Sequence, residues 1–342
     1  MTIGIDASKV AKPFKTGTET YSLEIIKALS KIDYQNQYLL YTPKSLREKL
    51  PGLPDNFQEK VLPWRKFWTQ IRLSWEMSRR KPDILFIPAH TLPLLFPQKT
   101  VVTLHDLGFK HFPELYSPTD IFYHNWAMDH AAKHAYHILV DAEFTKKDLL
   151  SNYPLDPAKI SVVPLGYDQK TFFPLREKKP INGQSKPYIF YVGRLEEKKN
   201  IAGMIAAYGI LRKERKINHQ FILAGRPGFG YEKIKAEIGK LPKNIQKDVI
   251  ELGYVDQKTY VDYLKNASIL FFCTFFEGFG LPVVEAMACG IPVVSSNRTS
   301  IPEITGKAAF LVNPQKPFDM AVALSKIINN KGLDKAYISK GL

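Results

Sequence analysis

Short apolar runs rich in β-branched and aromatic residues alternate along the whole chain with stretches of helical periodicity. Amphipathic stretches such as ETYSLEIIKALSKI and HNWAMDHAAKHA lie between these runs. Strands separated by helices in this way predict βαβ units, and therefore parallel sheets covered by helices. The expected strands are 2–6, 37–41, 83–87, 100–104, 137–140 and 159–163, and then 188–192, 220–224, 248–252, 268–272 and 291–296.

The alternation is interrupted once, by the polar and charged stretch PLREKKPINGQSKP (174–187). Its content of proline, glycine and charge is typical of a linker. We therefore expect an α/β protein with two Rossmann-like domains, 1–178 and 179–342. In open parallel sheets, ligands bind at the carboxyl ends of the strands. The loops that follow strands are therefore the places to look for chemistry.

Composition narrows the range of partners and locations. The chain has 342 residues and a net charge of +15, which favours phosphorylated small molecules, acidic lipids or nucleic acid. Basic residues are spread over both halves and no nucleic-acid module is recognisable, so we expect no nucleic-acid partner. No apolar run reaches transmembrane length and MTIGIDASKV reads as a first strand. Cys273 and Cys289, in apolar surroundings, fit buried thiols of a cytoplasmic protein.

The stretch FFEGFGLPVVEAMACG (275–290) places two carboxylates, Glu277 and Glu285, around the start of a predicted helix. A carboxylate accepts two hydrogen bonds from adjacent hydroxyls, as on a ribose or hexose ring. The alternative is that Glu277 caps the helix and Glu285 is exposed. That alternative is weak, because the neighbours of Glu285 are apolar and a glutamate among them needs a partner.

Two further loops favour anion binding. In YVGRLEEKKN, Arg194 and Lys199 flank the turn between a strand and a helix. A guanidinium, an ammonium and helix amides together suit a diphosphate, although the two cations could instead be solvated and paired with nearby glutamates. Gly17 stands just before the first predicted helix, where a backbone amide could approach an anion. On its own, this last signal is weak and is more typical of an ordinary helix start.

These motifs together resemble the retaining glycosyltransferases of family 4, which have the GT-B fold. The resemblance rests on VGRLEEKKN (192–200), on EGFGLPVVEAMACGIPVVSS (277–296), and on VDAEFTKKDLL followed by KISVVPLGYD (140–168). The segment VVTLHDLGFKHFPE (101–114) is similar to the bacterial mannosyltransferase-like subgroup. The resemblance covers nearly the whole chain. It implies two sheets that face each other across a cleft, with an acceptor-binding N-terminal and a nucleotide-sugar-binding C-terminal domain.

The resemblance also implies a role for each matching residue. Glu285 would hold the ribose of the nucleotide, and Glu277 the hydroxyls of the donor sugar. Arg194 and Lys199 would bind the diphosphate and stabilise it as it leaves. The remaining residues implied are the backbone of Phe279, Gly280 and Leu281 at sugar and phosphate, Tyr254 and Val255 at the base, Gly17 at the diphosphate, and His105 at the anomeric centre or the primary hydroxyl.

The implied reaction moves a hexose, mannose by subgroup, from a GDP- or UDP-linked donor to a glycan or lipid-linked acceptor in cell-surface polysaccharide synthesis. We expect no cofactor, no metal site and no requirement for a divalent metal, since the chain has no D-x-D triplet. The alternatives are a catalytically impaired GT-B protein and a nicotinamide enzyme, for which the G-x-G-x-x-G motif is missing. The chain ends at DKAYISKGL, so we expect it to lack the final helix that crosses back in this family.

Two other features invite a functional interpretation. His130 and His134 are one helical turn apart, but without an H-E-x-x-H motif we interpret them as structural rather than as metal ligands. Residues 44–81 are basic and contain Trp64, Trp68 and Trp75. This combination fits either peripheral contact with the inner face of the plasma membrane or a packed helix with a solvated basic face.

Overall fold

The chain folds into two compact units. The computed structural model describes residues 1–13, 17–179, 181, 186–214, 217–330 and 338–341. One unit contains residues 1–107 and 118–164, and the other contains residues 108–117 and 165–342. The last change from one unit to the other falls at Pro164–Leu165, earlier in the chain than the expected boundary at 178. Residues 108–117, which come from the first half of the sequence, belong to the C-terminal unit. The expectation that the final crossover helix is missing concerns the C-terminal end of the chain, where residues 331–337 and 342 lie outside the described part.

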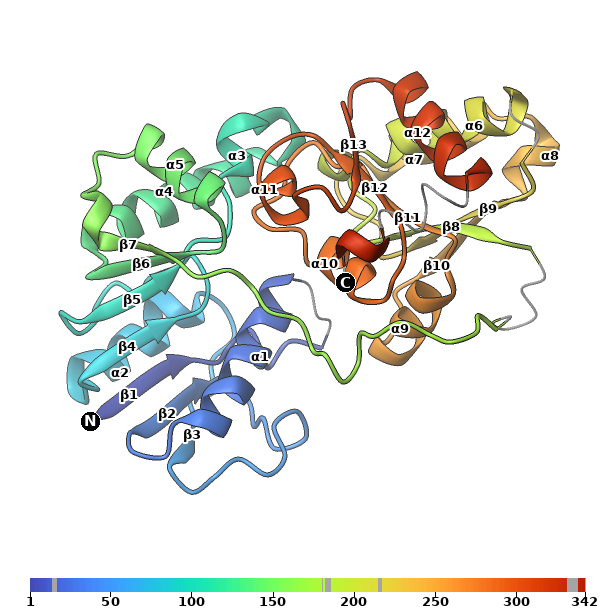
Figure 1. The fold of residues 1–342 in the computed structure, drawn as a ribbon. Helices are drawn as coiled ribbons and strands as arrows, with labels where there is room; N and C mark the ends of the chain where they lie inside the picture. The colour runs from blue at the N-terminus through green and yellow to red at the C-terminus, as the bar shows by residue number, and fades with distance from the viewer. Residues whose placement is uncertain (14–16, 180, 182–185, 215–216, 331–337, 342) are drawn as a thin grey trace. The chain divides into compact units, whose positions relative to one another are not determined.

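The N-terminal unit is built on a seven-stranded parallel sheet (Figure 1). The strands run in the order β3-β2-β1-β4-β5-β6-β7, so the direction of strand addition reverses between β1 and β4. The strands are β1 (Thr2–Asp6), β2 (Gln37–Thr42), β3 (Phe57–Val61), β4 (Ile84–Ile87), β5 (Thr100–Thr103), β6 (His137–Val140) and β7 (Ile160–Val162). The α-helices are α1 (Gly17–Ile32), α2 (Ser74–Arg79), α4 (Pro118–His134) and α5 (Glu143–Asn152), with a π-helical turn at η1 (Thr69–Leu73) before α2.

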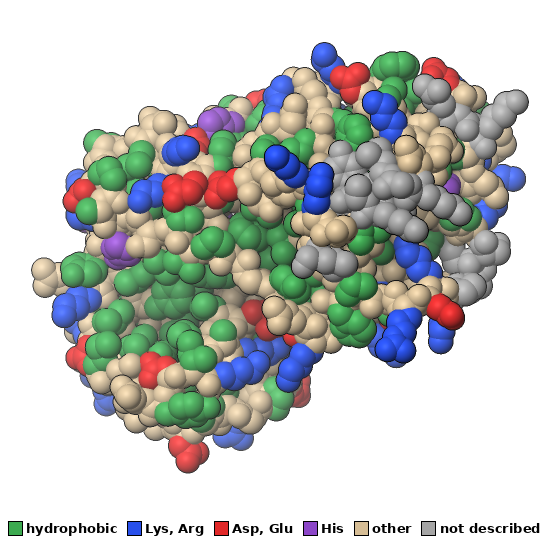
Figure 2. Space-filling view, viewed as in Figure 1, with side chains coloured by type: hydrophobic (Ala, Val, Ile, Leu, Met, Phe, Trp, Pro, Cys, Tyr) green, Lys and Arg blue, Asp and Glu red, His purple; other side chains and the backbone are tan. Residues whose placement is uncertain are grey.

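Helix α1 covers the β1–β2 part of this sheet. Its apolar side chains recur at helical spacing, and Leu23 and Ile26 are buried against Ile5 and Leu40 of the strands. Strands β4 and β6 alternate between buried and half-buried side chains, as expected for strands whose two faces are covered unequally. On the face drawn in Figure 2, the Lys and Arg side chains of the described residues are scattered and form no single basic band.

The C-terminal unit is built on a six-stranded parallel sheet of order β10-β9-β8-β11-β12-β13. The strands are β8 (Tyr188–Val192), β9 (Gln220–Ala224), β10 (Val249–Gly253), β11 (Ile269–Phe272), β12 (Val293–Ser296) and β13 (Phe310–Val312). The α-helices are α3 (Gly108–His111), α6 (Ile201–Glu214), α7 (Tyr231–Gly239), α8 (Lys243–Gln246), α9 (Gln257–Asn266), α10 (Leu281–Ala288), α11 (Ile301–Thr305) and α12 (Pro317–Asn329). Helix α12, red in Figure 1, packs against α6.

The core of the C-terminal unit is continuous on both faces of its sheet. Strand β11 is buried at every position and β8 at all but its last, which explains their uninterrupted apolar sequences. Phe190, Phe221 and Phe271 are fully buried. The sequence predicted eleven of the strands and missed β3 and β13. The letters FQEKV of β3 are mostly polar, and β13 has only three residues.

No helix among the described residues is both long and apolar enough to cross a membrane. Cys273 and Cys289 are buried free thiols, as predicted from their surroundings.

Candidate active site

The predicted donor-site residues of the C-terminal unit follow strands at the point where the sheet reverses direction. Arg194 and Lys199 come after β8, and Glu277 comes after β11. Strands β8 and β11 are hydrogen-bonded neighbours, and they begin the two halves of the sheet. Their carboxyl ends therefore diverge into separate loops at the place where open α/β sheets bind ligands.

The loop after β8 makes a close approach between two backbones that only glycine allows. Gly193 has φ +142°, a conformation that L side chains rarely adopt. A Cβ added to Gly225, after β9, would lie 1.8 Å from the carbonyl oxygen of Gly193. The amide of Gly193 also donates to the carbonyl of Ala224 at 2.9 Å. The contact fixes the direction in which the chain enters Arg194.

Lys199 and Glu277 are brought together by this arrangement. The Nζ atom of Lys199 lies 2.8 Å from Oε1 and 2.9 Å from Oε2 of Glu277. Both side chains are largely buried, with 18% and 11% of their surface exposed. Lys199 ends the 3₁₀ turn η4 (Glu197–Lys199), and Glu277 stands in the loop before α10. The sequence suggested separate partners for these charges, and the structure makes them partners of each other.

Asn200 anchors the loop that carries Lys199, and the sequence analysis gave it no role. Its backbone is left-handed, with φ 57°, which Asn tolerates better than most residues. Its buried side-chain amide donates to the carbonyls of Cys273 at 2.9 Å and Pro314 at 2.7 Å. It thus ties the start of α6 to the loops after β11 and β13. An Asn directly before an apolar helix was the available signal.

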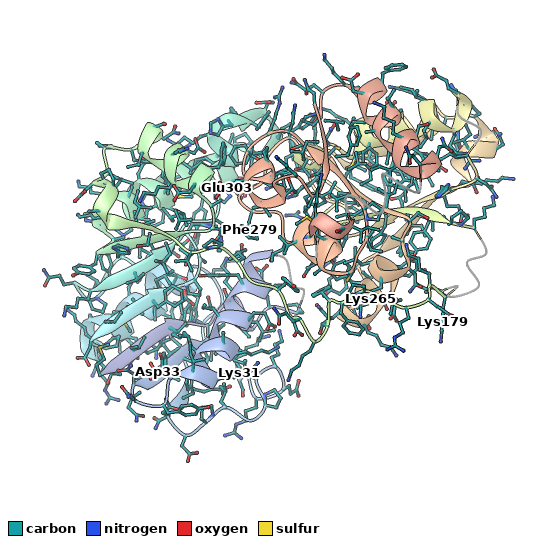
Figure 3. The ribbon with its side chains drawn as sticks, in the orientation of Figure 1. Lys31, Asp33, Lys179, Lys265, Phe279 and Glu303 are labelled. Carbon is teal, nitrogen blue, oxygen red and sulfur yellow. The ribbon has the colours of Figure 1, made fainter. Side chains whose placement is uncertain are left out.

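The loop from Gly278 to Gly280 leads into α10. Gly280 precedes the helix with φ 103°, and a Cβ there would lie 2.6 Å from Cδ1 of Ile301. Ser300 donates its hydroxyl to the carbonyls of Glu277 at 3.0 Å and of Phe279, labelled in Figure 3, at 3.1 Å. The loop carbonyls are therefore held toward α11. The backbone of Phe279, Gly280 and Leu281 forms the N-terminal end of α10, where helix amides favour negative charge.

Glu285 lies within α10 and is paired with a residue that the sequence analysis did not identify. The hydroxyl of Tyr260, on α9, donates a short hydrogen bond to Oε2 of Glu285. Burial raises the pKa of Glu285 to about 7, although the hydrogen bond from Tyr260 opposes this shift. A glutamate within an apolar helix was expected to need a partner. The partner could not be named because Tyr260 belongs to a helix distant in sequence.

Arg194 remains accessible, with 55% of its side chain exposed. Its Nε lies 3.5 Å from Oε2 of Glu196, and Lys198 Nζ lies 3.6 Å from Oε1 of the same carboxylate. The pairing of Arg194 with a nearby glutamate is thus present. Glu196 is buried and has Lys198 as a second cation, so its carboxylate keeps a partner when the exposed Arg194 guanidinium turns to an incoming anion.

Tyr254 and Val255 follow β10 at the same edge of the sheet. Tyr254 is exposed, whereas Val255 is partly buried against the core. Asp256 caps α9, and its Oδ1 accepts the amide of Thr259 at 2.8 Å. The cap fixes the backbone at the position predicted to contact the base.

His105 belongs to the N-terminal unit and follows β5. Its Nδ1 lies 2.7 Å from Oδ2 of Asp141, which follows the neighbouring strand β6, and its Nε2 lies 3.4 Å from the carbonyl of Pro88. The ring of Tyr21 meets the imidazole edge-on at a centroid distance of 4.9 Å. Burial lowers the pKa of His105, but Asp141, the Pro88 carbonyl and Asp106 outweigh it, and the pKa lies above its ordinary value.

Gly17 is the first residue of α1 and is exposed, with nothing within 4 Å of the position that a Cβ would take. The residues just before it, 14–16, lie outside the described part of the chain. Its predicted contact with a diphosphate therefore stays a prediction.

The two helical histidines are involved in aromatic contacts on α4. The His130 ring stacks on Trp126 at a centroid distance of 5.5 Å, and its Nε2 lies 3.1 Å from the carbonyl of Pro93. His134 lies 4.9 Å from His130. Among the described residues, no group of three or more His, Cys, Asp or Glu side chains is arranged to hold a metal ion.

Two family models of known proteins match this chain. The model described as Glycosyltransferase Family 4 matches residues 15–171, and the model described as Glycosyl transferases group 1 matches residues 173–341. The chain belongs to glycosyltransferase family 4 and has the GT-B fold. The first model ends at residue 171 and the second begins at residue 173, just after the break between the two units at Pro164–Leu165, and their ranges include the site residues described above.

A relative and two solved structures show how far the likeness reaches. The chain is 27% identical to O-antigen chain mannosyltransferase B of Escherichia coli, over 87% of this chain and 83% of the relative. Sucrose-phosphate synthase from Thermosynechococcus elongatus is 18% identical, with a TM-score of 0.77 over 100% of this chain and 93% of that one. Anabaena Alr3699/HepE, solved with UDP-glucose, is 16% identical, with a TM-score of 0.72 over 100% and 93%. The protein is thus a glycosyltransferase, and an O-antigen chain mannosyltransferase is among the relatives that it resembles.

Proposed function

We propose that this glycosyltransferase moves a hexose, in the first instance mannose, from a nucleoside diphosphate sugar to a hydroxyl of a glycan or lipid-linked acceptor in cell-surface polysaccharide synthesis. The observation that carries the proposal is the site around α10. Residues 277–285 contain Glu277, the N-terminal end of α10 and Glu285. Glu277 forms a bidentate pair with Lys199, and Glu285 is hydrogen-bonded to Tyr260. Mannose is supported by the likeness to O-antigen chain mannosyltransferase B, and a nucleotide sugar by the UDP-glucose bound to the Anabaena protein.

Each group has a chemical task in this proposal. Glu285 accepts hydrogen bonds from the ribose diol, and Glu277 from hydroxyls of the sugar. As the bond from the anomeric carbon to the phosphate oxygen breaks, negative charge grows on the diphosphate. Arg194, Lys199 and the α10 amides stabilise that charge. The acceptor oxygen forms the new bond on the face that the diphosphate leaves, so configuration is retained, and the leaving phosphate takes the acceptor's proton.

The backbone near Tyr254 and Val255 contacts the base in this proposal, and Phe279, Gly280 and Leu281 contact sugar and phosphate. His105 acts at the anomeric centre or the primary hydroxyl of the sugar, and the amide of Gly17 acts at the diphosphate. A divalent metal is not required, because the cations and helix amides meet the charge of the diphosphate.

Calorimetric titration of GDP and UDP without metal tests the proposal. We expect one of them to bind at micromolar concentration and Glu285→Ala to weaken that binding by about 1–3 kcal/mol. Glu232→Ala, an exposed glutamate on α7, is the matched control and leaves the affinity unchanged. A panel of sugars on the preferred nucleotide then identifies the donor. If the folded protein binds neither nucleotide, the assignment of residues 277–285 is wrong.

Peripheral contact with an anionic membrane is the location that we propose for this activity. Trp68 is buried and donates to the carbonyl of Leu62 at 2.7 Å, so that tryptophan belongs to the core. Other apolar side chains of residues 44–81 are exposed. Two more exposed side chains, Leu94 and Leu95, lie in a loop that is tied to the start of α2, because the Leu94 amide donates to the Ser74 hydroxyl. The exposed side chains are Trp64, Phe67, Ile71, Trp75, Leu94 and Leu95.

The charge around this surface matches the proposal. Two guanidinium groups contact the Trp75 ring, with Arg72 at 4.6 Å and Arg79 at 4.8 Å from its centre. Exposed aromatics next to basic side chains bind the interface of acidic lipids. Flotation with vesicles containing phosphatidylglycerol should recover the protein, and neutralising Arg65, Lys66 and Arg72 together should release it. Unchanged recovery of the triple variant, or no recovery of the native protein, would refute this location.

A further inference from the structure

A short segment that precedes α4 in the sequence belongs structurally to the C-terminal unit. It is residues 108–117, GFKHFPELYS, between β5 and α4. It has a defined local fold, with the helical turn α3 followed by the 3₁₀ turn η2 (Pro113–Leu115). The amide of Phe112 donates to the carbonyl of Gly108 at 2.9 Å, and that of Tyr116 to the carbonyl of Pro113 at 3.1 Å. The segment is therefore a preformed element rather than an extended connection.

One side of this segment stacks on the loop that presents Glu277. The His111 ring lies parallel to Phe276 at a centroid distance of 5.1 Å and an angle of 24°. The Phe112 ring stacks on Phe275 at 6.0 Å and 24°, and meets Phe276 edge-on at 6.2 Å. Aromatic pairs at these separations attract each other beyond the area they bury. Phe275 and Phe276, whose rings the segment contacts, directly precede Glu277 in the sequence.

The other end of the segment contacts the loop that presents Lys199. The Nζ atom of Lys198 lies 3.3 Å from the hydroxyl of Tyr116 and 5.1 Å from the centre of its ring. An ammonium at this distance from an aromatic ring is stabilised by a cation–π interaction. Lys198 directly precedes Lys199. The two loops are also joined to each other, because the amide of Phe275 donates to the carbonyl of Lys198 at 3.3 Å.

We propose that residues 108–117 position the Lys199–Glu277 pair, with Phe112 and Tyr116 as the positioning residues. Each half of the pair stands next to a residue that this segment holds, so the segment fixes both loops at once. Loops with neighbouring glycines, such as Gly278 and Gly280, order poorly unless packing restrains them. The inference rests on the proposed role of the pair in donor binding. His105 lies on the same connection, three residues before the segment begins.

Phe112→Ala tests the proposal by kinetics and by hydrogen exchange. We expect kcat/KM for the nucleotide sugar to fall by roughly three- to tenfold, the size of a lost aromatic contact. Backbone amides of residues 273–280 should exchange faster in the free protein, which needs no ligand and no activity. Phe122→Ala, an exposed ring on α4, is the matched control and should change neither quantity.

Tyr116→Phe provides the finer comparison, because it keeps the ring over Lys198 and removes only the hydroxyl. We expect a smaller loss than with Phe112→Ala and no general loss of stability, with Tyr136→Phe as the exposed control. Glu277→Gln separates the two hypotheses. If it abolishes transfer while Phe112→Ala changes neither kinetics nor exchange, the positioning role is wrong and the proposed function stands. If Glu277→Gln has no effect on donor use, the proposed function itself is wrong.

Discussion

The Nζ atom of Lys199 lies within 2.9 Å of both carboxylate oxygens of Glu277. In the free protein, the ammonium proposed to meet the diphosphate is therefore neutralised by the carboxylate proposed to meet the sugar. A complete donor offers each group a new partner, hydroxyls for Glu277 and phosphate oxygens for Lys199. A nucleoside diphosphate without its sugar offers a partner only to Lys199.

Glu277→Gln should therefore separate nucleotide binding from transfer. The change frees Lys199, so affinity for the nucleoside diphosphate alone stays the same or increases. Transfer falls by about 100-fold, because the sugar loses a charged hydrogen-bond acceptor and its position. Calorimetry with the diphosphate and an initial-rate assay with the nucleotide sugar measure the two effects.

Lys199→Met is the companion variant, and it should weaken diphosphate binding instead. It leaves the carboxylate of Glu277 largely buried without its cation, so some loss of stability is also expected. Equal weakening of diphosphate binding by both variants would show that the pair acts only as a structural ion pair.

Nucleotide affinity should depend on pH through Glu285. Burial raises the pKa of this carboxyl to about 7, so it carries a proton below that pH. The ionised form accepts both hydrogen bonds of a ribose diol, and the protonated form accepts fewer. The dissociation constant should therefore fall as pH rises from 6 to 8, by at most tenfold per unit on the acidic side.

Glu285→Gln should bind more weakly than the native protein at pH 8 and should lose this pH dependence. The matching stability effect has the opposite sign, because a raised carboxyl pKa means that the folded state binds more protons than the unfolded one. Glu285 thus contributes a loss of stability as pH rises from about 4.5 to 7, which Glu285→Gln removes. A native affinity that is flat from pH 6 to 8 would contradict the assignment of Glu285 to the ribose.

Most strands could be predicted from the sequence because each is marked by apolar residues that are consecutive in the chain. Buried parallel strands read as apolar runs, and eleven of them could be located in this way. Strand β3 could not, because its letters FQEKV follow no apolar pattern and its place is set by pairing with β2. The assignment of residues 108–117 to the C-terminal unit was equally hidden, since it depends on ring contacts between segments far apart in the chain.

The candidate site divides in the same way. Glycine, proline and charge near strand ends pointed to Arg194, Lys199, Glu277 and Glu285. Their partners depend on the fold, so the sequence could not show that Lys199 bonds Glu277 or that Tyr260 bonds Glu285. Asp141 was missed for a similar reason. It follows β6, His105 follows β5, and only the pairing of these strands brings the two together.

Asp141→Asn should shift the pH profile of transfer. Asp141 stabilises the imidazolium form of His105 and contributes to its raised pKa, so the change should lower that pKa. The groups that face this imidazole are Asp141, Asp106, His90, the Tyr21 ring and the Pro88 carbonyl. If protonated His105 supports transfer, the alkaline limb of kcat should move to lower pH. NMR titration of the histidine measures the pKa directly.

Stability supplies an independent check on the same pair. A raised histidine pKa stabilises the folded state fully below the unfolded value of about 6.5, and this contribution is lost as pH rises through the folded pKa. Asp141→Asn should therefore cost more stability at pH 5.5 than at pH 9. A loss of the same size at both values would mean that Asp141 acts through packing rather than through the charge of His105.

Gly225→Ala should destabilise the C-terminal unit and disturb the donor loop. The new Cβ would lie 1.8 Å from the carbonyl oxygen of Gly193, which is backbone and cannot rotate away. One of the two strand ends must move, at a cost of at least about 2 kcal/mol in the free energy of unfolding. Because the displaced chain continues into Arg194, nucleotide affinity should fall as well.

Gly239→Ala, in α7 with nothing within 4 Å of the added methyl, is the matched control and should be neutral or stabilising by up to about 1 kcal/mol. Urea denaturation of both variants measures the difference, and equal stability would show that β8 and β9 do not approach each other as closely as the structure places them.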